Sequence, residues 1–160
     1  MNEYWVKSTD GILFRLNKRD KEIGTLTYSD GFYSASITMA DGKVFQFEST
    51  GFSLWRNLSL KKEDEVILKF RFHWTKILVI KSFFGTQRDY LFTYEGILNP
   101  RHVLIDRAEK EILIIRHNTV SEPFSFNFNI TKTDSFIDFE GSEVLLLAAI
   151  HFVRYCESVY

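Results

Sequence analysis

The sequence predicts a mainly β protein: an antiparallel β-barrel of roughly twelve strands, closed around a buried hydrophobic C-terminal α-helix. Three observations lead to this prediction. Short segments of alternating or continuous apolar character follow one another along most of the chain, separated by turn residues. Aromatic residues make up 16% of the chain, including 16 Phe, and such side chains favour pleated, half-buried surfaces. The segment Val144–Cys156, "VLLLAAIHFVRYC", is apolar nearly all round and carries no charge before Arg154.

Length and composition favour a single domain over residues 1–160. At that length, folding buries roughly 70% of the surface that the unfolded chain exposes, so the core needs no disulfide or metal. The chain is 45% hydrophobic and 26% charged, which is ordinary for a globular protein. We expect strands over about residues 4–131 and the central helix over about residues 143–156.

Turn signals separate the expected strands in the first third of the chain. Asp30-Gly31 and Asp41-Gly42 each stand between apolar runs, and Asp-Gly is a strong hairpin signal because Gly accepts a positive φ. Two such signals 11 residues apart predict an antiparallel meander. The expected strands here are Ile12–Asn17, Ile23–Ser29, Tyr33–Met39 and Lys43–Ser49, with an optional further strand at Tyr4–Lys7.

The same rhythm continues to residue 131. Lys76–Phe84 is nearly continuous in apolar character, as expected of a strand buried on both faces. Phe124–Ile130 alternates strictly, which places its Phe side chains and its final Ile on one face. So many strands in one small domain favour a closed barrel or a sandwich, because open sheet edges invite aggregation. The remaining expected strands are Ser53–Leu60, Val66–Trp74, Asp89–Glu95, His102–Asp106 and Glu111–His117.

The last element has the signals of a helix. Ser142 is a suitable N-cap, and Glu143 suits the positive end of the helix dipole. Leu and Ala, which are strong helix formers, then dominate the segment. An apolar stripe would pack on one face of a sheet, whereas a helix that is apolar all round needs protein on every side.

This helix is too short for a membrane and is therefore expected inside the barrel. Val144–Val153 contains ten residues, and a membrane-spanning helix needs about 20. A strand-rich chain can bury such a helix by closing its sheet around it. We therefore expect Leu146 and Ile150 to be buried, and His151 and Arg154 to lie towards the mouth of the barrel.

This order of about twelve short antiparallel strands followed by the helix "VLLLAAIHFVRYC" resembles the tubby C-terminal-like superfamily. That superfamily includes tubby, the plant LURP-one-related proteins and the phospholipid scramblases. The resemblance covers the whole chain and lies in the element order and in the helix. It implies a barrel wrapped around a central apolar helix, and binding of lipid head groups or proteins rather than catalysis. Because no diagnostic motif is shared, no site residue is carried over.

Charge and cysteine content limit the expected partners and compartment. Lys and Arg number 20 against 21 Asp and Glu, and the resulting net charge of −1 does not favour nucleic acid. The single cysteine, Cys156, excludes an intrachain disulfide and fits a reducing compartment. The start of the chain, "MNEYWVKSTDG", lacks the apolar run of a signal peptide. We expect a cytoplasmic protein with no transmembrane segment.

Familiar catalytic and cofactor motifs are not found in the sequence. Gly51–Trp55 contains Gly-x-Ser, but Trp55 stands where a nucleophile elbow needs its second Gly. Gly-rich phosphate loops and paired metal-ligand spacings are also missing, so we expect no cofactor and no metal. One diffuse set stays open: His102, Asp106 and His117 converge if their two strands form a hairpin.

Two basic groups are candidates for a surface that binds an anionic ligand. The candidate residues are Arg15, Lys18, Arg19 and Lys21 at one expected hairpin, and Lys69 and Arg71 on one strand face. Either group suits a lipid phosphate or an anionic protein partner. A solvated turn, or charges that discourage strand-edge pairing, is the favoured interpretation of each group.

Together these observations favour a non-enzymatic cytoplasmic binding or scaffold module that recognises lipid head groups or a protein partner on its outer surface. One alternative is a small-molecule or fatty-acid carrier of the lipocalin type, which needs the helix outside the barrel with one polar face. Another is an enzyme with the diffuse His/Asp site. A helix that fills the interior makes any contact with lipid peripheral.

Overall fold

The computed structural model describes residues 2–29, 34–50, 57–73, 77–83, 85–118 and 121–159. The Asp30-Gly31 turn, the Gly51–Trp55 segment and Trp74, on which sequence predictions fall, lie outside these described residues. Twelve strands and one helix are found within them. The strands are β1 (Asn2–Ser8), β2 (Leu13–Lys18), β3 (Lys21–Tyr28), β4 (Ala35–Met39), β5 (Val44–Thr50), β6 (Asn57–Lys62), β7 (Glu65–His73), β8 (Ile77–Ser82), β9 (Arg88–Glu95), β10 (Arg101–Ile105), β11 (Glu111–Asn118) and β12 (Phe126–Lys132).

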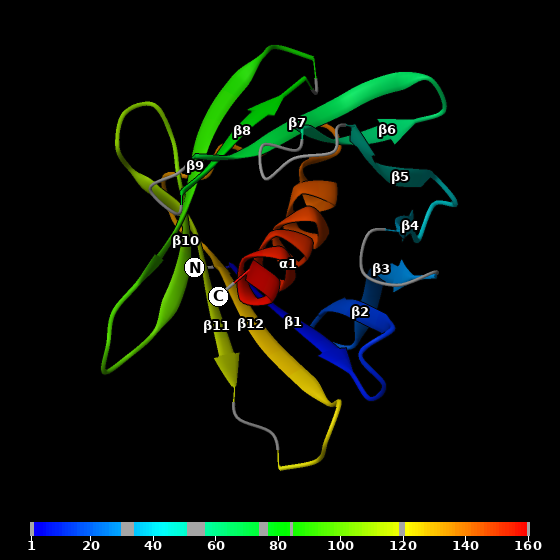
Figure 1. Ribbon diagram of the computed structural model, residues 1–160, viewed down its shortest axis with the longest axis vertical. Helices are drawn as coiled ribbons and strands as arrows, with labels where there is room; N and C mark the ends of the chain where they lie inside the picture. The colour runs from blue at the N-terminus through cyan, green and yellow to red at the C-terminus, as the bar shows by residue number, and fades with distance from the viewer. Residues whose placement is uncertain are drawn as a thin grey trace.

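The strands form a closed antiparallel barrel (Figure 1). Each strand pairs with its neighbours in the chain, and β1 pairs with β12 to close the sheet. Across this seam Tyr4 faces Ile130 and Val6 faces Phe128. Among the described strands, closure leaves no edge free to pair with another chain. The predicted fold class is confirmed, and the optional strand at Tyr4–Lys7 is part of the strand that closes the barrel.

Helix α1 (Ser142–Val159) lies in the middle of the barrel (Figure 1). Leu146 and Ile150 are 0% exposed, as are the three residues between them, so the predicted burial on every side is confirmed. The helix extends further than the expected range of about 143–156. In the part of the chain that the structure describes, no helix is long and apolar enough to cross a membrane.

Aromatic side chains join the helix to the wall. The Phe152 ring lies 4.6 Å from the Phe70 ring of β7 and 5.7 Å from the Phe92 ring of β9, measured between centroids. These pairs are tilted or T-shaped, which are the favourable arrangements for aromatic rings. The inward residues of the strands and the apolar residues of α1 form one continuous core.

The two ends of the barrel have different boundaries. We call the end at which α1 begins the proximal end; it carries the β2–β3, β4–β5, β6–β7, β8–β9 and β10–β11 connections. The distal end carries the β1–β2, β9–β10 and β11–β12 connections together with the last turn of α1. The segment of residues 133–141 leads from β12 into α1 at the proximal end.

Three hairpins at the proximal end share one irregularity. In each of the β2–β3, β6–β7 and β10–β11 pairs the register shifts by a β-bulge close to the turn. The extra residue is Ile23, Ile67 or Ile112, and all three are buried. A bulge bends its strand and changes the direction of a side chain, so in each hairpin an isoleucine points into the proximal mouth.

Gly24 lets the helix approach the wall. Helix α1 comes closest to β3 and β4. A Cβ placed on Gly24 would lie 2.9 Å from the Thr38 carbonyl oxygen and 3.0 Å from Leu147 Cδ1. The Thr38 contact is with backbone of the neighbouring strand, which cannot move aside without breaking the sheet. The position therefore requires the absence of a side chain.

We expect Gly24→Ala to lower the free energy of unfolding by about 1–3 kcal/mol, because the added methyl overpacks the contact between β3 and α1. Urea denaturation measures this change. Thr25→Ala is the matched control, since Thr25 points outward from the same strand, and it should change stability by no more than about 0.5 kcal/mol. Equal stability of Gly24→Ala and the unaltered protein would contradict this packing.

Candidate functional site

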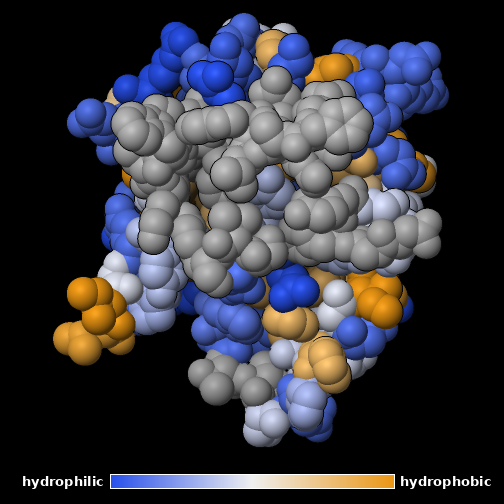
Figure 2. Space-filling view, in the orientation of Figure 1, coloured by the Kyte–Doolittle hydropathy of each residue, from blue (hydrophilic) through white to orange (hydrophobic). Residues whose placement is uncertain are grey.

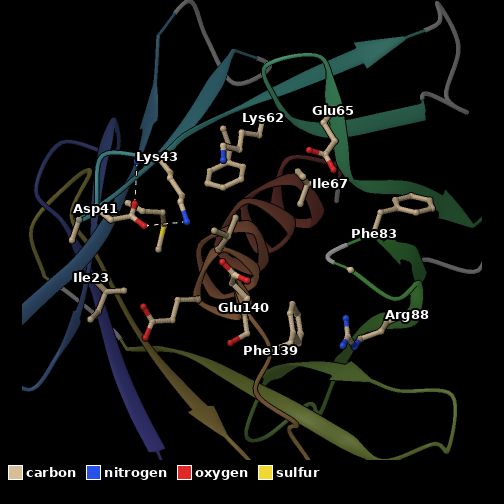
Figure 3. Close-up of a pocket in the computed structure, with 18 of the residues that line it drawn as sticks. Ile23, Asp41, Lys43, Lys62, Glu65, Ile67, Phe83, Arg88, Phe139 and Glu140 are labelled. Carbon is tan, nitrogen blue, oxygen red and sulfur yellow. Dashed lines mark hydrogen bonds and ion pairs between the residues drawn. The ribbon is translucent and has the colours of Figure 1, made fainter.

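A cleft of about 900 Å³ opens at the proximal end, around the start of α1 (Figure 3). Its walls come from the β2–β3, β4–β5, β6–β7 and β8–β9 hairpins and from the segment that enters the helix. This volume lies in the range of ligand-binding clefts. Because α1 fills the interior, the cleft is a recess at the mouth and not a central cavity.

The floor of the cleft is apolar. Two of the bulged isoleucines, Ile23 and Ile67, line it together with buried Phe45. Phe83 and Phe139 are half-buried and line its sides. Such a floor favours binding of an apolar portion of a ligand.

The rim of the cleft carries equal numbers of basic and acidic side chains. The basic residues are Lys21, Lys43, Lys62 and Arg88, and the acidic residues are Asp41, Glu65, Glu140 and Glu143. Lys43 Nζ lies 3.4 Å from Asp41 Oδ2. The backbone N–H of Lys43 also donates to Asp41, and this hydrogen bond lowers the pKa of the Asp41 carboxyl.

Arg88 is held on one wall. Its guanidinium lies 4.1 Å from the Phe139 ring centroid, and its Nη1 donates to the Thr86 carbonyl oxygen at 3.1 Å. Figure 3 shows Arg88 and Phe139 side by side at the start of the helix. This cation–π contact ties the β8–β9 connection to the segment that enters α1.

Several rim charges have no ion-pair partner among the residues that the structure describes. None of the ion pairs among the described residues uses Lys21, Lys62, Glu65 or Glu140. Lys62 and Glu65 face each other across the β6–β7 turn, yet their charged groups do not pair. Adjacent Lys61, on the outer side of the wall, does pair, with its Nζ 2.8 Å from Glu48 Oε2.

A smaller cleft of about 350 Å³ lies on the other side of the segment that enters α1. The third bulged isoleucine, Ile112, lines it together with Phe136 and Ile137. An ion pair between Arg107 and Asp89 spans its edge. Residues 133–141 therefore divide the proximal mouth into two unequal recesses, both lined by Arg88.

The three residues proposed as a diffuse enzyme site do not form a cluster. Asp106 lies in the proximal β10–β11 turn, where its Oδ1 accepts the N–H groups of Ala108 and Lys110. His102 and His117 lie on the distal halves of β10 and β11. No group of three metal-ligating side chains is found among the described residues.

The predicted basic residues fall into two separate groups. In the first, Arg15 pairs with Glu22 at 3.0 Å, Arg19 lies in the β2–β3 turn, and Lys21 alone lines the large cleft. Lys18 Nζ lies 5.3 Å from the Tyr4 ring. The second group, Lys69 and Arg71, lies exposed on β7, beyond the intervening strands β4, β5 and β6. The outer-surface site for an anionic ligand therefore stays a prediction, now with two separate locations.

The expectation that His151 lies towards the mouth is wrong, whereas Arg154 does lie near the distal end. His151 is buried, and its Nδ1 lies 2.8 Å from the Tyr28 hydroxyl. Its ring lies 4.1 Å from that of Phe47, between centroids. Burial lowers the pKa of His151 to about 3, and the nearby Arg154 charge acts in the same direction. His151 is thus a neutral core residue satisfied by a partner from β3.

Burial holds two more reactive groups in their neutral forms. His102 stacks on Phe92, with ring centroids 5.5 Å apart, and burial lowers its pKa to about 4. Burial raises the pKa of the Cys156 thiol to about 12, so the reactive thiolate is disfavoured. Cys156 is packed in the core, as its place in an apolar helix suggests.

Sequence reasoning missed most of the cleft residues. Lys43, Lys62, Glu65 and Arg88 come from three different turn regions, and each resembles an ordinary solvated turn charge. What these residues share is their position in the topology. Every second connection of an antiparallel meander lies at the same end, so their turns lie together. This shared position becomes a usable signal only once the strand count and the closure are known.

The comparisons with known proteins found no relative. No protein-family model matches the chain, and neither a curated protein nor a solved structure matches it. The resemblance to the tubby-like superfamily stays a prediction.

Substituting Tyr28 alone, and then Tyr28 together with His151, tests the hydrogen bond between them. Tyr28→Phe removes the hydrogen bond to His151 Nδ1, and we expect it to cost about 1–3 kcal/mol of unfolding free energy. Tyr28→Phe with His151→Phe removes both polar groups and should recover part of that loss. Denaturant titrations at neutral pH measure both variants. A double variant less stable than Tyr28→Phe alone would contradict the pairing.

The same variants test acid sensitivity. Below the ordinary pKa of 6.5 the unfolded chain protonates His151 while the folded chain does not, so stability falls as pH drops from 6.5 towards 3. His102 acts in the same sense down to about pH 4. In the double variant, the contribution of His151 to this pH dependence should be absent. That contribution is up to about 1.4 kcal/mol of unfolding free energy per pH unit. An unchanged slope would contradict a neutral, buried His151.

Proposed function

We propose that this protein is a non-enzymatic binding module that holds a small zwitterionic ligand with an apolar portion in the large proximal cleft. The observation that carries this proposal is an apolar floor beneath rim charges of both signs, several of which form no ion pair among the described residues. Both recesses described above lie at the proximal end, beside the start of α1.

The rim favours a ligand that carries both charges. Lys62 and Glu65 come from the two strands of one hairpin and line the same cleft without pairing to each other (Figure 3). Lys21 and Glu140 add one further charge of each sign from other segments. A purely anionic ligand would approach carboxylates, and a purely cationic one would approach ammonium groups. A zwitterion can satisfy both.

The floor favours an apolar portion beside the charges. Ile67 on the floor, with Phe83 and Phe139 on the sides, presents aliphatic and aromatic surface under the charged rim. Burying such surface contributes about 25 cal/mol for each Å² removed from water. Fixed polar groups around a mostly apolar floor are the usual design of small-ligand sites.

Two features support binding rather than catalysis. The buried histidines and the thiol lie outside the cleft lining, and burial keeps them neutral. General acid–base catalysis needs a group that titrates near the working pH within reach of substrate. The position of α1 supports a ligand at the mouth, because the helix occupies the space in which a lipocalin-type carrier would hold its cargo.

Calorimetric titration with three probes tests the proposal: monomeric dihexanoyl phosphatidylcholine, phosphocholine, and an aromatic dipeptide with free termini. We expect binding of at least one probe, and tighter binding of the two probes with apolar portions than of phosphocholine. Lys62→Gln and Glu65→Gln should each weaken binding roughly tenfold, because each removes a charge-assisted contact. The phosphatidylcholine and dipeptide arms distinguish a lipid-derived ligand from a peptide-derived one.

Lys61→Gln is the matched control, because Lys61 neighbours Lys62 in sequence but pairs with Glu48 instead of lining the cleft. We expect it to leave affinity unchanged. Equal weakening by Lys61→Gln and Lys62→Gln would place the ligand elsewhere, and no binding of any probe would reject a zwitterion site.

A further inference from the structure

The β9–β10 hairpin carries two adjacent aliphatic side chains that contact almost nothing. Ile97 is 99% exposed and Leu98 is 100% exposed. The hairpin projects from the barrel at the lower left of Figure 1, and Figure 2 shows a strongly hydrophobic group projecting from the same corner. Single exposed apolar residues are common on protein surfaces, but a fully exposed adjacent pair at a projecting tip is a distinct feature.

The backbone holds this pair outward in a defined turn. Gly96 has a φ of 89°, and a Cβ there would lie 2.7 Å from the Asn99 carbonyl oxygen. Pro100 fixes the backbone at the exit of the turn. Arg101 then donates to Glu95 at 3.1 Å and to Glu111 at 2.7 Å, which ties the base of the hairpin to β11.

Exposed apolar side chains also lie in or beside the neighbouring distal connections. Going round the barrel, the β9–β10 connection is followed by β11–β12 and then by β1–β2. Phe124 in β11–β12 is 75% exposed, and Ile12 beside β2 and Tyr94 near the end of β9 are exposed as well. One arc of the distal rim therefore presents five large apolar side chains to solvent.

We propose that this arc is a membrane-contacting edge, in which Ile97 and Leu98 enter the hydrocarbon of a zwitterionic lipid bilayer. Phe124, Ile12 and Tyr94 then lie closer to the bilayer interface, where an aromatic residue with a polar tip, such as Tyr94, is favoured. The inference does not depend on the proximal cleft, which lies at the other end of the barrel and stays open when the distal rim meets a membrane.

The shape of the rim favours lipid over a protein surface. The apolar side chains stand on three separate connections with polar residues between them. A protein interface needs a continuous complementary surface of about 800 Å² on each partner. Fluid hydrocarbon accepts separate side chains independently, because it adapts to each one.

The charged side chains near the arc favour a zwitterionic bilayer over an anionic one. The described residues of the three connections include two charged side chains, Asp10 and Glu122, and both are acidic. Arg101 at the hairpin base is already bonded to two glutamates. Among the described residues, these connections therefore hold no basic side chain of the kind that draws proteins to anionic lipids, and the nearest on β1 is the single exposed Lys7. A zwitterionic surface also avoids repulsion of the carboxylates.

Flotation with phosphatidylcholine vesicles tests the proposal. We expect the unaltered protein to float with the vesicles, and the variant Ile97→Ser with Leu98→Ser to partition roughly ten- to a hundredfold less. Ile137→Ser is the matched control, since Ile137 is 80% exposed but lies at the proximal end. It should partition as the unaltered protein does. All three side chains are exposed, so unchanged circular dichroism is expected for every variant.

A site-specific probe distinguishes insertion from surface contact. Leu98→Cys can be labelled with an environment-sensitive fluorophore, because the natural Cys156 is buried. We expect its emission to rise and shift to the blue with phosphatidylcholine vesicles, while the same label at Ile137→Cys stays unchanged.

Four outcomes would overturn the proposal. They are no flotation of the unaltered protein, equal flotation of the serine variant, an unchanged signal at position 98, and binding only to vesicles that contain a phosphoinositide. In the last case, loss of binding by Lys18→Glu with Arg19→Glu would assign the contact to the β2–β3 hairpin. Self-association that depends on Ile97 and Leu98, without vesicle binding, would assign the tip to a protein contact instead.

Discussion

The whole structure depends on the need to keep an all-round apolar helix out of water. Leu145 through Ile150 of α1 have no exposed surface, so protein must surround the helix on every side. The barrel, in turn, needs its interior filled. A barrel of about eight strands is filled by its own side chains, whereas a wider one needs something more in its interior. The helix fills the twelve-stranded barrel, and the barrel buries the helix, so each element supplies the apolar contacts that the other needs.

As a consequence of this mutual burial, the two proposed binding sites lie at the ends of the barrel. The helix occupies the centre, and the outer wall carries ordinary ion pairs such as Arg15–Glu22 and Lys61–Glu48. At the proximal end, residues 133–141 must cross the mouth to reach the start of α1, and the space left beside them forms two recesses. The cleft is thus a geometric consequence of threading a helix into a closed sheet, and the hairpin turns around it supply its charges.

Much of this fold can be predicted from the sequence, because its strongest signals are local. The alternation of Phe124–Ile130 and the Asp-Gly turn signals indicate strands and hairpins, and the apolar helix indicates closure. The β-bulges at Ile23, Ile67 and Ile112 leave no such signal, because an isoleucine in a strand looks the same with or without a register shift. The partner of His151 is Tyr28, 123 residues away, so periodicity along the helix could not reveal it. The cleft residues were hidden for the same reason, since four separate turns come together only in the closed barrel.

The fold of the β9–β10 hairpin does not depend on the side chains at its tip. Gly96, Pro100 and the ion pairs of Arg101 determine the backbone of the hairpin, and none of them involves the side chains of residues 97 and 98. Polar residues at these two positions would satisfy the same turn and would suit water better. The core gains nothing from Ile97 or Leu98, since both are almost fully exposed. Their apolar character is therefore not explained by the stability of the barrel, and a contact outside the molecule explains it directly. The two ends of the barrel then have distinct chemistry: mixed charge over an apolar recess at one, and projecting aliphatic side chains at the other.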